Sequence, residues 1–167
     1  MANVLSEALT ARDANTYTYR DTELTAGALK EVVGVVSPAA DQSASDFLMF
    51  VAVPSNAIIS QVMISAADAS TGGAIDVGIF EKNTDGTYSA VDDDLFASAL
   101  DLAGGPYNNL DITHESGEYT YAETEKPLWE VLGLTTDPKK DYIVASDITT
   151  VFNGGPTSIK LQVRFRQ

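Results

Sequence analysis

The sequence predicts a mainly β protein, organised as a single antiparallel β-sandwich with one or two short helices. Apolar segments of strand length recur along the chain, turns rich in Gly and Pro separate them, and helical periodicity is rare. The chain has 167 residues, enough for one domain with its own core, and no cysteine, which excludes disulfides and thiolate metal sites. We expect a β-sandwich domain over residues 28–167, preceded by an N-terminal arm over residues 1–27.

The N-terminal arm is too poor in apolar residues to form a core. Its only helical stripe is short, and Tyr17 and Tyr19 lie in a stretch that we expect to be extended. An ordered arm of this kind must pack against the sandwich or a neighbouring subunit, so both tyrosines are candidate interface residues. The N-terminus lacks the features of a secretory signal, and no apolar run is long enough for a membrane-spanning helix.

The first two strands are predicted over residues 29–36 and 46–53. The first contains two pairs of valines, which favour extended structure. The second carries a continuous apolar run from Phe47 to Val53, a pattern that indicates burial on both faces. Pro54 then begins a turn.

The next two strands are predicted over residues 57–66 and 73–82 by their alternating apolar residues. The first strand places Ile58, Val62 and Ile64 on one of its faces. The second strand likewise places Ile75, Val77 and Ile79 on one of its own faces. A hairpin turn follows, because Gly86 supplies the positive φ that tight turns require.

The middle of the chain leaves two alternatives open. Residues 94–100 fit either a short helix capped by Asp94 or an edge strand. Beyond them, residues 110–113 and 119–122 are expected to be short strands on either side of a polar turn that contains His114.

The C-terminal segment is the most clearly patterned part of the sequence. Residues 128–134 predict one or two helical turns, ended by Gly133 and Pro138. Strands follow over residues 142–148 and 158–166. The last strand alternates strictly: its apolar face holds Ile159, Leu161, Val163 and Phe165, and its polar face holds Lys160, Gln162, Arg164 and Arg166.

The net charge of −14 is unevenly distributed. Residues 65–125 contain thirteen acidic side chains and one basic, whereas residues 126–167 contain four and six. Such an acidic body repels a phosphate backbone, so we expect no nucleic-acid partner. On the final strand, Lys160, Arg164 and Arg166 form the surface most suited to an acidic neighbour, and we take them as candidate interface residues.

Few residues are suited to chemistry. His114 is the only histidine and no Gly-x-Ser-x-Gly sequence occurs, so we expect no catalytic residues and no enzymatic activity. Asp92, Asp93 and Asp94 are weak calcium candidates, because their spacing does not match the alternating ligands of known calcium loops. We expect no cofactor.

Trp129 is the only tryptophan, and its surroundings allow two interpretations. It has the aromatic surface that stacks on sugars. Its neighbours Leu128, Val131 and Leu132 instead favour an anchor in the core or in an interface, which we consider the better interpretation.

Three passages, in this order, are similar to small virion proteins of tailed bacteriophages that decorate or cement the capsid. They are Val51–Ala57, Ile75–Phe80, and the Trp129 segment with Asp137-Pro138. The resemblance covers roughly residues 46–167. Together with the number of strands, it favours a jelly-roll-like sandwich.

The resemblance implies a non-enzymatic protein that binds the outer surface of a phage head. Its partners would be the major capsid protein and further copies of itself, as a dimer or trimer, and it would reinforce contacts between capsid subunits. The alternative is a carbohydrate- or calcium-dependent adhesive sandwich, such as a head-fibre or tail accessory protein. A hydrolase is the least favoured class, since the acidic residues show no recognisable catalytic pair.

Overall fold

The computed structural model describes residues 28–38, 43–67, 72–152 and 158–167. The predicted arm lies outside these residues, as do Tyr17 and Tyr19. No helix of the described ranges is long and apolar enough to span a membrane. The elements are, in order, β1 (Lys30–Val36), β2 (Phe47–Pro54), β3 (Ile58–Ala66), β4 (Ala74–Lys82), β5 (Tyr88–Asp101), η1 (Leu102–Gly104), β6 (Tyr107–Asp111), α3 (Leu128–Val131), β7 (Asp141–Thr150) and β8 (Ile159–Arg166).

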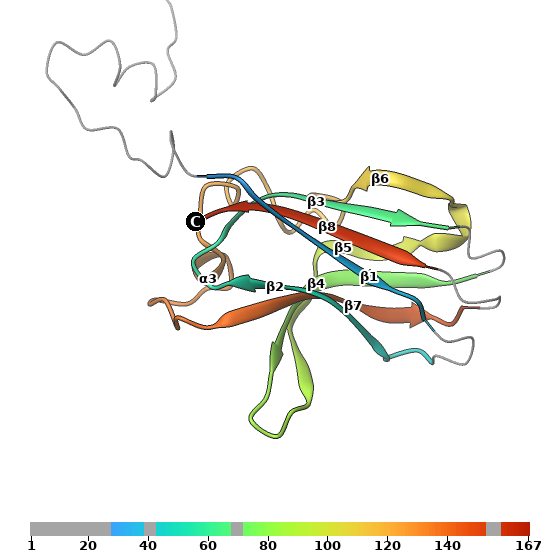
Figure 1. Cartoon of the computed structure of the whole chain (residues 1–167), viewed down its shortest axis with the longest axis horizontal. Coiled ribbons are helices and arrows are strands. Elements are labelled where there is room, and N and C mark those ends of the chain that lie inside the picture. Colours follow the sequence, from blue (N-terminus) through green and yellow to red (C-terminus); the bar gives the residue numbers. More distant parts are fainter. Residues whose placement is uncertain (1–27, 39–42, 68–71, 153–157) are drawn as a thin grey trace, which may run out of the picture.

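The strands form two antiparallel sheets of four strands each, which confirms the predicted sandwich (Figure 1). Sheet A has the order β1-β8-β3-β6, and sheet B has the order β2-β7-β4-β5. The pairs β1·β8, β2·β7, β3·β6 and β4·β5 are nested one within the next along the chain. This is the arrangement of a long hairpin rolled up on itself, the jelly roll.

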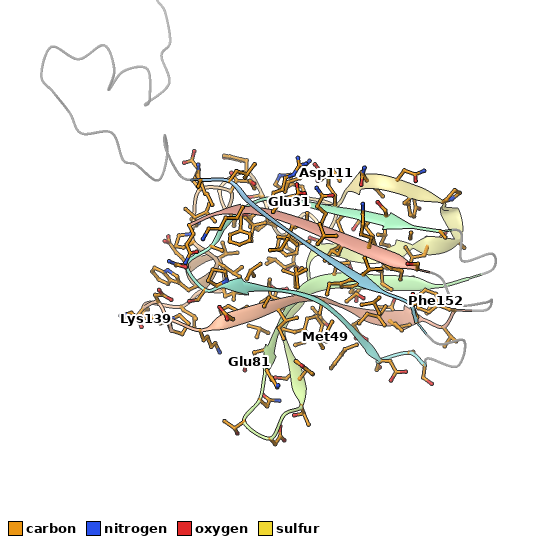
Figure 2. The ribbon with its side chains drawn as sticks, in the orientation of Figure 1. Glu31, Met49, Glu81, Asp111, Lys139 and Phe152 are labelled. Carbon is orange, nitrogen blue, oxygen red and sulfur yellow. The ribbon has the colours of Figure 1, made fainter. Side chains whose placement is uncertain are left out.

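The core lies between the two sheets and is built from alternate residues of the strands. Ile75, Val77 and Ile79 are completely buried, as predicted. The predicted apolar face of β8 is also buried. Side chains fill the space between the sheets, whereas Glu31 and Asp111 lie outside sheet A and Met49 and Glu81 outside sheet B (Figure 2).

The two sheets come into backbone contact where β1 passes over β2. A Cβ atom at Gly34 would lie 2.5 Å from the carbonyl oxygen of Phe50, closer than real Cβ atoms come to any atom. Only glycine allows this approach. Gly34 therefore closes one side of the sandwich.

Residues 94–100 belong to edge strand β5, so the strand alternative is correct and the helix alternative is wrong. The strand is strongly bulged: Ile79 pairs with Asp92, but Val77, two residues away, pairs with Ala97. The extra length crosses the face of β4 at Gly78, where a Cβ atom would lie 2.1 Å from the carbonyl oxygen of Asp92. The bulge thereby places the aspartate run against sheet B.

The apolar run of β2 is not buried on both faces, contrary to the sequence prediction. Leu48, Val51 and Val53 are buried, but Phe47 is 38% exposed and Ala52 is also exposed. The reason is that the described structure has two layers, so the outer face of sheet B, β2 included, has no further layer packed on it.

Two further predictions are wrong in detail. A bulge between Ile59 and Gln61 reverses the alternation of β3, so Ile59 rather than Ile58 shares the core face with Val62. Residues 119–122 form a bend and a turn instead of a strand, where Thr120 donates a hydrogen bond to the Glu123 carboxylate and Thr124 donates one to the Tyr121 carbonyl.

Candidate functional site

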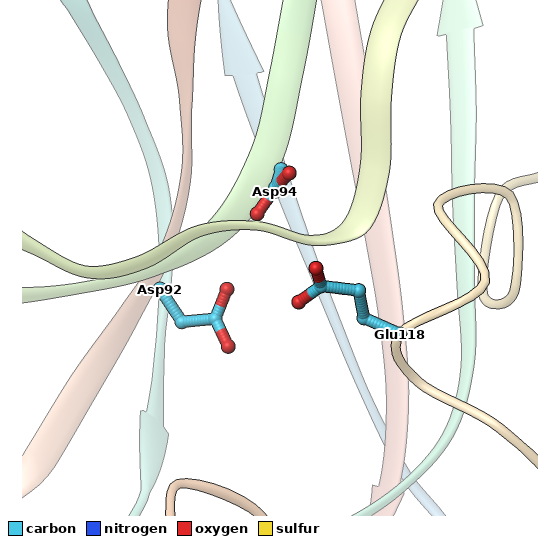
Figure 3. A group of neighbouring side chains, drawn as sticks. All are labelled: Asp92, Asp94 and Glu118. Carbon is cyan, nitrogen blue, oxygen red and sulfur yellow. The ribbon is translucent and has the colours of Figure 1, made fainter.

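The bulge of β5 and a distant turn bring three carboxylates together. Asp92 and Asp94 face Glu118, and one oxygen of each side chain lies within 4.8 Å of the others (Figure 3). Asp93 is not part of this group, since successive side chains of an extended chain point to opposite sides. Sequence reasoning missed Glu118, which lies 24 positions beyond Asp94 and carries no local signal of proximity.

The acidic group is electrostatically unfavourable. The pKa of Asp92 is raised to about 6, mainly by burial and also by the charges of Glu118, Asp94 and Asp93, while a hydrogen bond from the Asp94 N–H lowers it. Burial also raises the pKa of Asp147, assisted by the charges of Asp93 and other carboxylates. The three carboxylates of the group offer hard oxygen ligands, fewer than the six to eight that calcium prefers. They therefore form an incomplete cation site and a region of mutual repulsion.

Asp92→Asn is expected to stabilise the protein at neutral pH. The folded-state pKa of Asp92 is raised above its ordinary value of 3.8, so the charged form costs stability above pH 6, and this cost disappears as the pH falls toward 4. Since the side chain is partly solvated, we expect a gain of about 1 kcal/mol, or about 3 °C in Tm, at pH 7.5. Thermal unfolding at pH 7.5 and pH 4.5 measures the effect.

The control is Glu125→Gln, which removes the same charge from an exposed position outside the acidic group. It is expected to leave Tm within about 1 °C. A gain for Asp92→Asn that is equally large at pH 4.5 would contradict repulsion as the cause.

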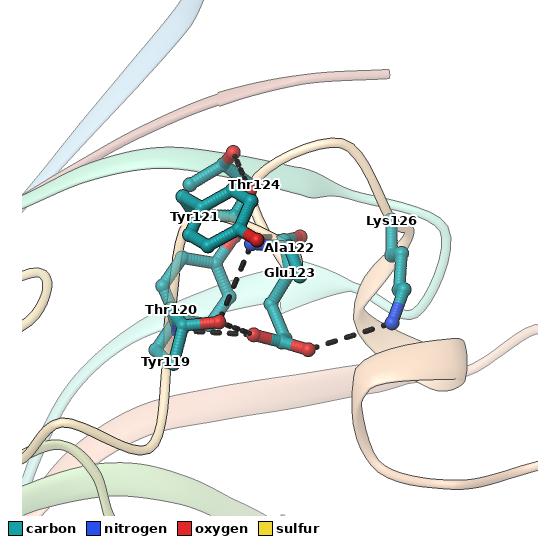
Figure 4. A network of polar contacts seen from close by, with 7 residues as sticks. All are labelled: Tyr119, Thr120, Tyr121, Ala122, Glu123, Thr124 and Lys126. Carbon is teal, nitrogen blue, oxygen red and sulfur yellow. Dashed lines mark hydrogen bonds and ion pairs between the residues drawn. The ribbon is translucent and has the colours of Figure 1, made fainter.

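The turn that carries Glu118 is held by Tyr119. The Tyr119 side chain is 1% exposed, packs edge-on against Phe96, and donates its hydroxyl hydrogen bond to the Ile59 carbonyl at 2.7 Å. The following turn is closed by Glu123, which accepts bonds from the Thr120 N–H and hydroxyl (Figure 4). The loop is thus fixed on the core rather than free.

His114 is exposed, and its ring is engaged within this loop. It stacks on Tyr119 with 5.7 Å between ring centroids, and its Nδ1 contacts the Tyr119 carbonyl oxygen. These contacts give the only histidine a structural role.

Trp129 lines a surface pocket at one end of the sandwich and is not part of the core. In α3 it is Leu128 that is buried, at 1% exposure, and Trp129 remains partly exposed. Their N–H groups donate to the carbonyls of Ala57 and Ser55, at 2.8 and 2.9 Å, and these bonds fix the helix. The pocket of about 340 Å³ is lined by Asn56, Ile58, Pro127, Trp129, Glu130, Arg166 and Gln167. Trp129 is therefore not an anchor in the core, contrary to one of the two predicted roles, and an interface role stays a prediction.

The basic residues of β8 lie on the outer face of sheet A in three different environments. Arg164 is already paired, with Nε donating to Glu31 at 2.7 Å and Nη1 donating to Gln61 at 3.0 Å. Lys160 is partly exposed and borders a shallow hollow beside β6. Arg166 reaches the Trp129 pocket, and its buried Nε has no hydrogen-bond partner among the described residues. They therefore do not act as one basic patch.

Comparison with known proteins gives a likeness of fold only. No family model matches the sequence, and no curated protein matches it. A chain in the structure of the capsid of Ralstonia phage GP4 has a TM-score of 0.57 at 14% identity, covering 84% of this chain and 85% of that chain. A chain in the structure of the cyanophage Pam1 capsid asymmetric unit has a TM-score of 0.56 at 15% identity, covering 96% of this chain and 99% of that chain.

Proposed function

We propose that this protein is a non-enzymatic component of a phage virion that binds the outside of the head and stabilises contacts between major capsid proteins. The observation that carries the proposal is the likeness to the Pam1 capsid chain, which extends over 96% of this chain and 99% of that one. A similarity over the full length of both chains relates the whole fold to a capsid component of about this size. It is more informative than a similarity limited to one motif.

The side chains on the surface support a protein that acts by burying an extended interface with its partner rather than by a reactive site. We include the absence of enzymatic activity in the proposal, since the acidic group holds only carboxylates among the described residues. On a symmetric shell, each copy adds one modest interface, and many copies acting together give a large gain in shell stability. We include homo-oligomerisation, as a dimer or trimer, in the proposal.

The proposal is tested by adding the purified protein to phage heads that lack it and imaging the particles by cryo-electron microscopy. We expect density outside the shell at positions repeated with the capsomers, and heads that resist heating better than undecorated heads. Density at a single vertex, or no binding, would contradict the proposal.

Deletion of residues 1–27 is expected to weaken binding to heads by about tenfold or more while leaving the domain folded. The described core lies entirely between Leu48 and Phe165, so the deletion removes none of it. Co-sedimentation with heads measures binding, and circular dichroism and Tm check the fold. Undiminished binding of the truncated protein would exclude the arm as a contact.

The Trp129 pocket supports a second candidate, the saccharide-binding adhesive sandwich. It combines a partly exposed indole with the amides of Asn56 and Gln167 and the charges of Glu130 and Arg166, groups that recognise sugar rings and hydroxyls. Titration of Trp129 fluorescence with a panel of saccharides distinguishes the candidates. A saturable change would favour adhesion, and a flat response together with head binding would favour decoration.

A further inference from the structure

Strand β1 presents an apolar, exposed edge at one side of the sandwich. It is the terminal strand of sheet A and pairs with β8 alone, so its other backbone edge has no strand beside it in the described structure. On its outer face Val33 is 50% exposed and Val35 is 61% exposed. Leu29, directly before the strand, is 63% exposed. Unpaired backbone beside apolar side chains is the usual template for adding another strand.

The other three sheet edges carry features that discourage such pairing. The pairing of β2 is interrupted by a bulge after Met49, and the strand ends at Pro54. Strand β5 has three register shifts and contains the aspartate run. Strand β6 has only five residues, with a shift in its pairing and a positive φ at Asn109. By contrast, β1 pairs with β8 in unbroken register from Lys30 to Val36 and has no charge after Glu31.

The charge distribution also favours this edge for contact between copies of a chain with net charge −14. Glu31 is paired with Arg164, and Lys30 bonds to the side chain of Gln167 at 2.6 Å. Asp92 and Asp94 of the acidic group lie on β5, at the opposite edge of the other sheet. Two copies that meet at β1 therefore keep their most acidic surfaces apart.

We propose that β1 pairs antiparallel with β1 of a second copy across a two-fold axis, which joins the two A sheets into one sheet of eight strands. The residues of β1 can lie opposite those of β1 in the second copy without bringing unpaired like charges together. With Val33 opposite Val33 of the second copy, Val35 lies opposite Glu31, and the Glu31 carboxylate remains paired with Arg164. The outward-facing valines of the two copies then form one apolar stripe, and both unpaired backbone edges are satisfied. This inference does not depend on binding to a capsid.

The first experiment measures the mass of the full chain by size-exclusion chromatography with light scattering. We expect twice the chain mass of 17.7 kDa. Val33→Lys places two like charges across the axis and is expected to raise the dissociation constant by about tenfold or more. Val91→Lys is the matched control, because Val91 is 41% exposed on β5, an edge strand of the other sheet, and it is expected to leave the mass unchanged.

The second experiment uses the absence of cysteine from the chain. Val33→Cys is expected to give a covalent dimer on mild oxidation, whereas Val91→Cys is not. If the full-length protein is a monomer, the proposal is wrong. This holds even if a variant without residues 1–27 forms a dimer. A trimer would also overturn the proposal. The same is true of a dimer that withstands Val33→Lys and that Val33→Cys fails to cross-link.

Discussion

Gly78→Ala is expected to lower the free energy of unfolding by about 3 kcal/mol. The new methyl group would lie 2.1 Å from the carbonyl oxygen of Asp92 and 2.5 Å from the carbonyl carbon of Asp93. Both are backbone atoms of the β5 bulge, which cannot yield as the end of a flexible side chain can. Either the bulge lifts from β4 or the two strands separate, and urea unfolding measures the loss.

The matched control is Gly104→Ala. Its methyl group would meet the hydroxyl of Tyr107 at 2.9 Å, the far end of a side chain that can move. We expect a cost below about 1 kcal/mol. Similar losses for both variants would mean that backbone crowding at Gly78 is not the cause. If the bulge lifts, the stabilising effect of Asp92→Asn should also shrink in the Gly78→Ala background.

Tyr119→Ala is expected to cost about 4 kcal/mol. The substitution empties a site that is 1% exposed, removes the edge-on contact with Phe96, and leaves the Ile59 carbonyl without its hydroxyl partner. The loop that carries Glu118 would lose its attachment to the core. Urea unfolding measures the cost, and the pH dependence of stability should weaken in parallel.

Two controls separate the contributions of Tyr119. Tyr119→Phe keeps the ring and removes the hydroxyl, for an expected cost of about 1–2 kcal/mol. Tyr121→Ala alters a side chain that is 88% exposed two residues away and should change stability by less than about 0.5 kcal/mol. A Tyr119→Phe variant as unstable as Tyr119→Ala would assign the effect to the hydrogen bond rather than to packing.

The sequence predicted strands and faces well where one face of a strand is buried and the alternation is regular. Residues 73–82 and 158–166 show the predicted inward residues buried. Prediction was wrong at Ile58, Phe47 and residues 119–122. The causes are a bulge in β3, the uncovered outer face of a two-layer sandwich and local hydrogen bonds of threonine side chains, and none of these alters the hydrophobic pattern of the sequence.

The candidate site was less predictable than the fold. Asp92 and Asp94 were recognised as an acidic group, but Glu118 comes from a turn far along the chain. The aromatic character of Trp129 was recognised, whereas its exposure depends on which side of a four-residue helix faces the β2–β3 turn. The apolar edge of β1 was not recognised, because valine pairs in a sequence do not show whether a strand is central or terminal.

By itself, the sequence determined that this chain forms short strands around one core, because alternation and turn residues act over a few neighbouring positions. Only the tertiary structure decided that the strands nest as a jelly roll, and that Gly34 and Gly78 lie under crossing backbone. It also decided which strand presents an open edge. These features depend on which distant strands pair and in which register. A pattern of a few neighbouring residues does not contain that information.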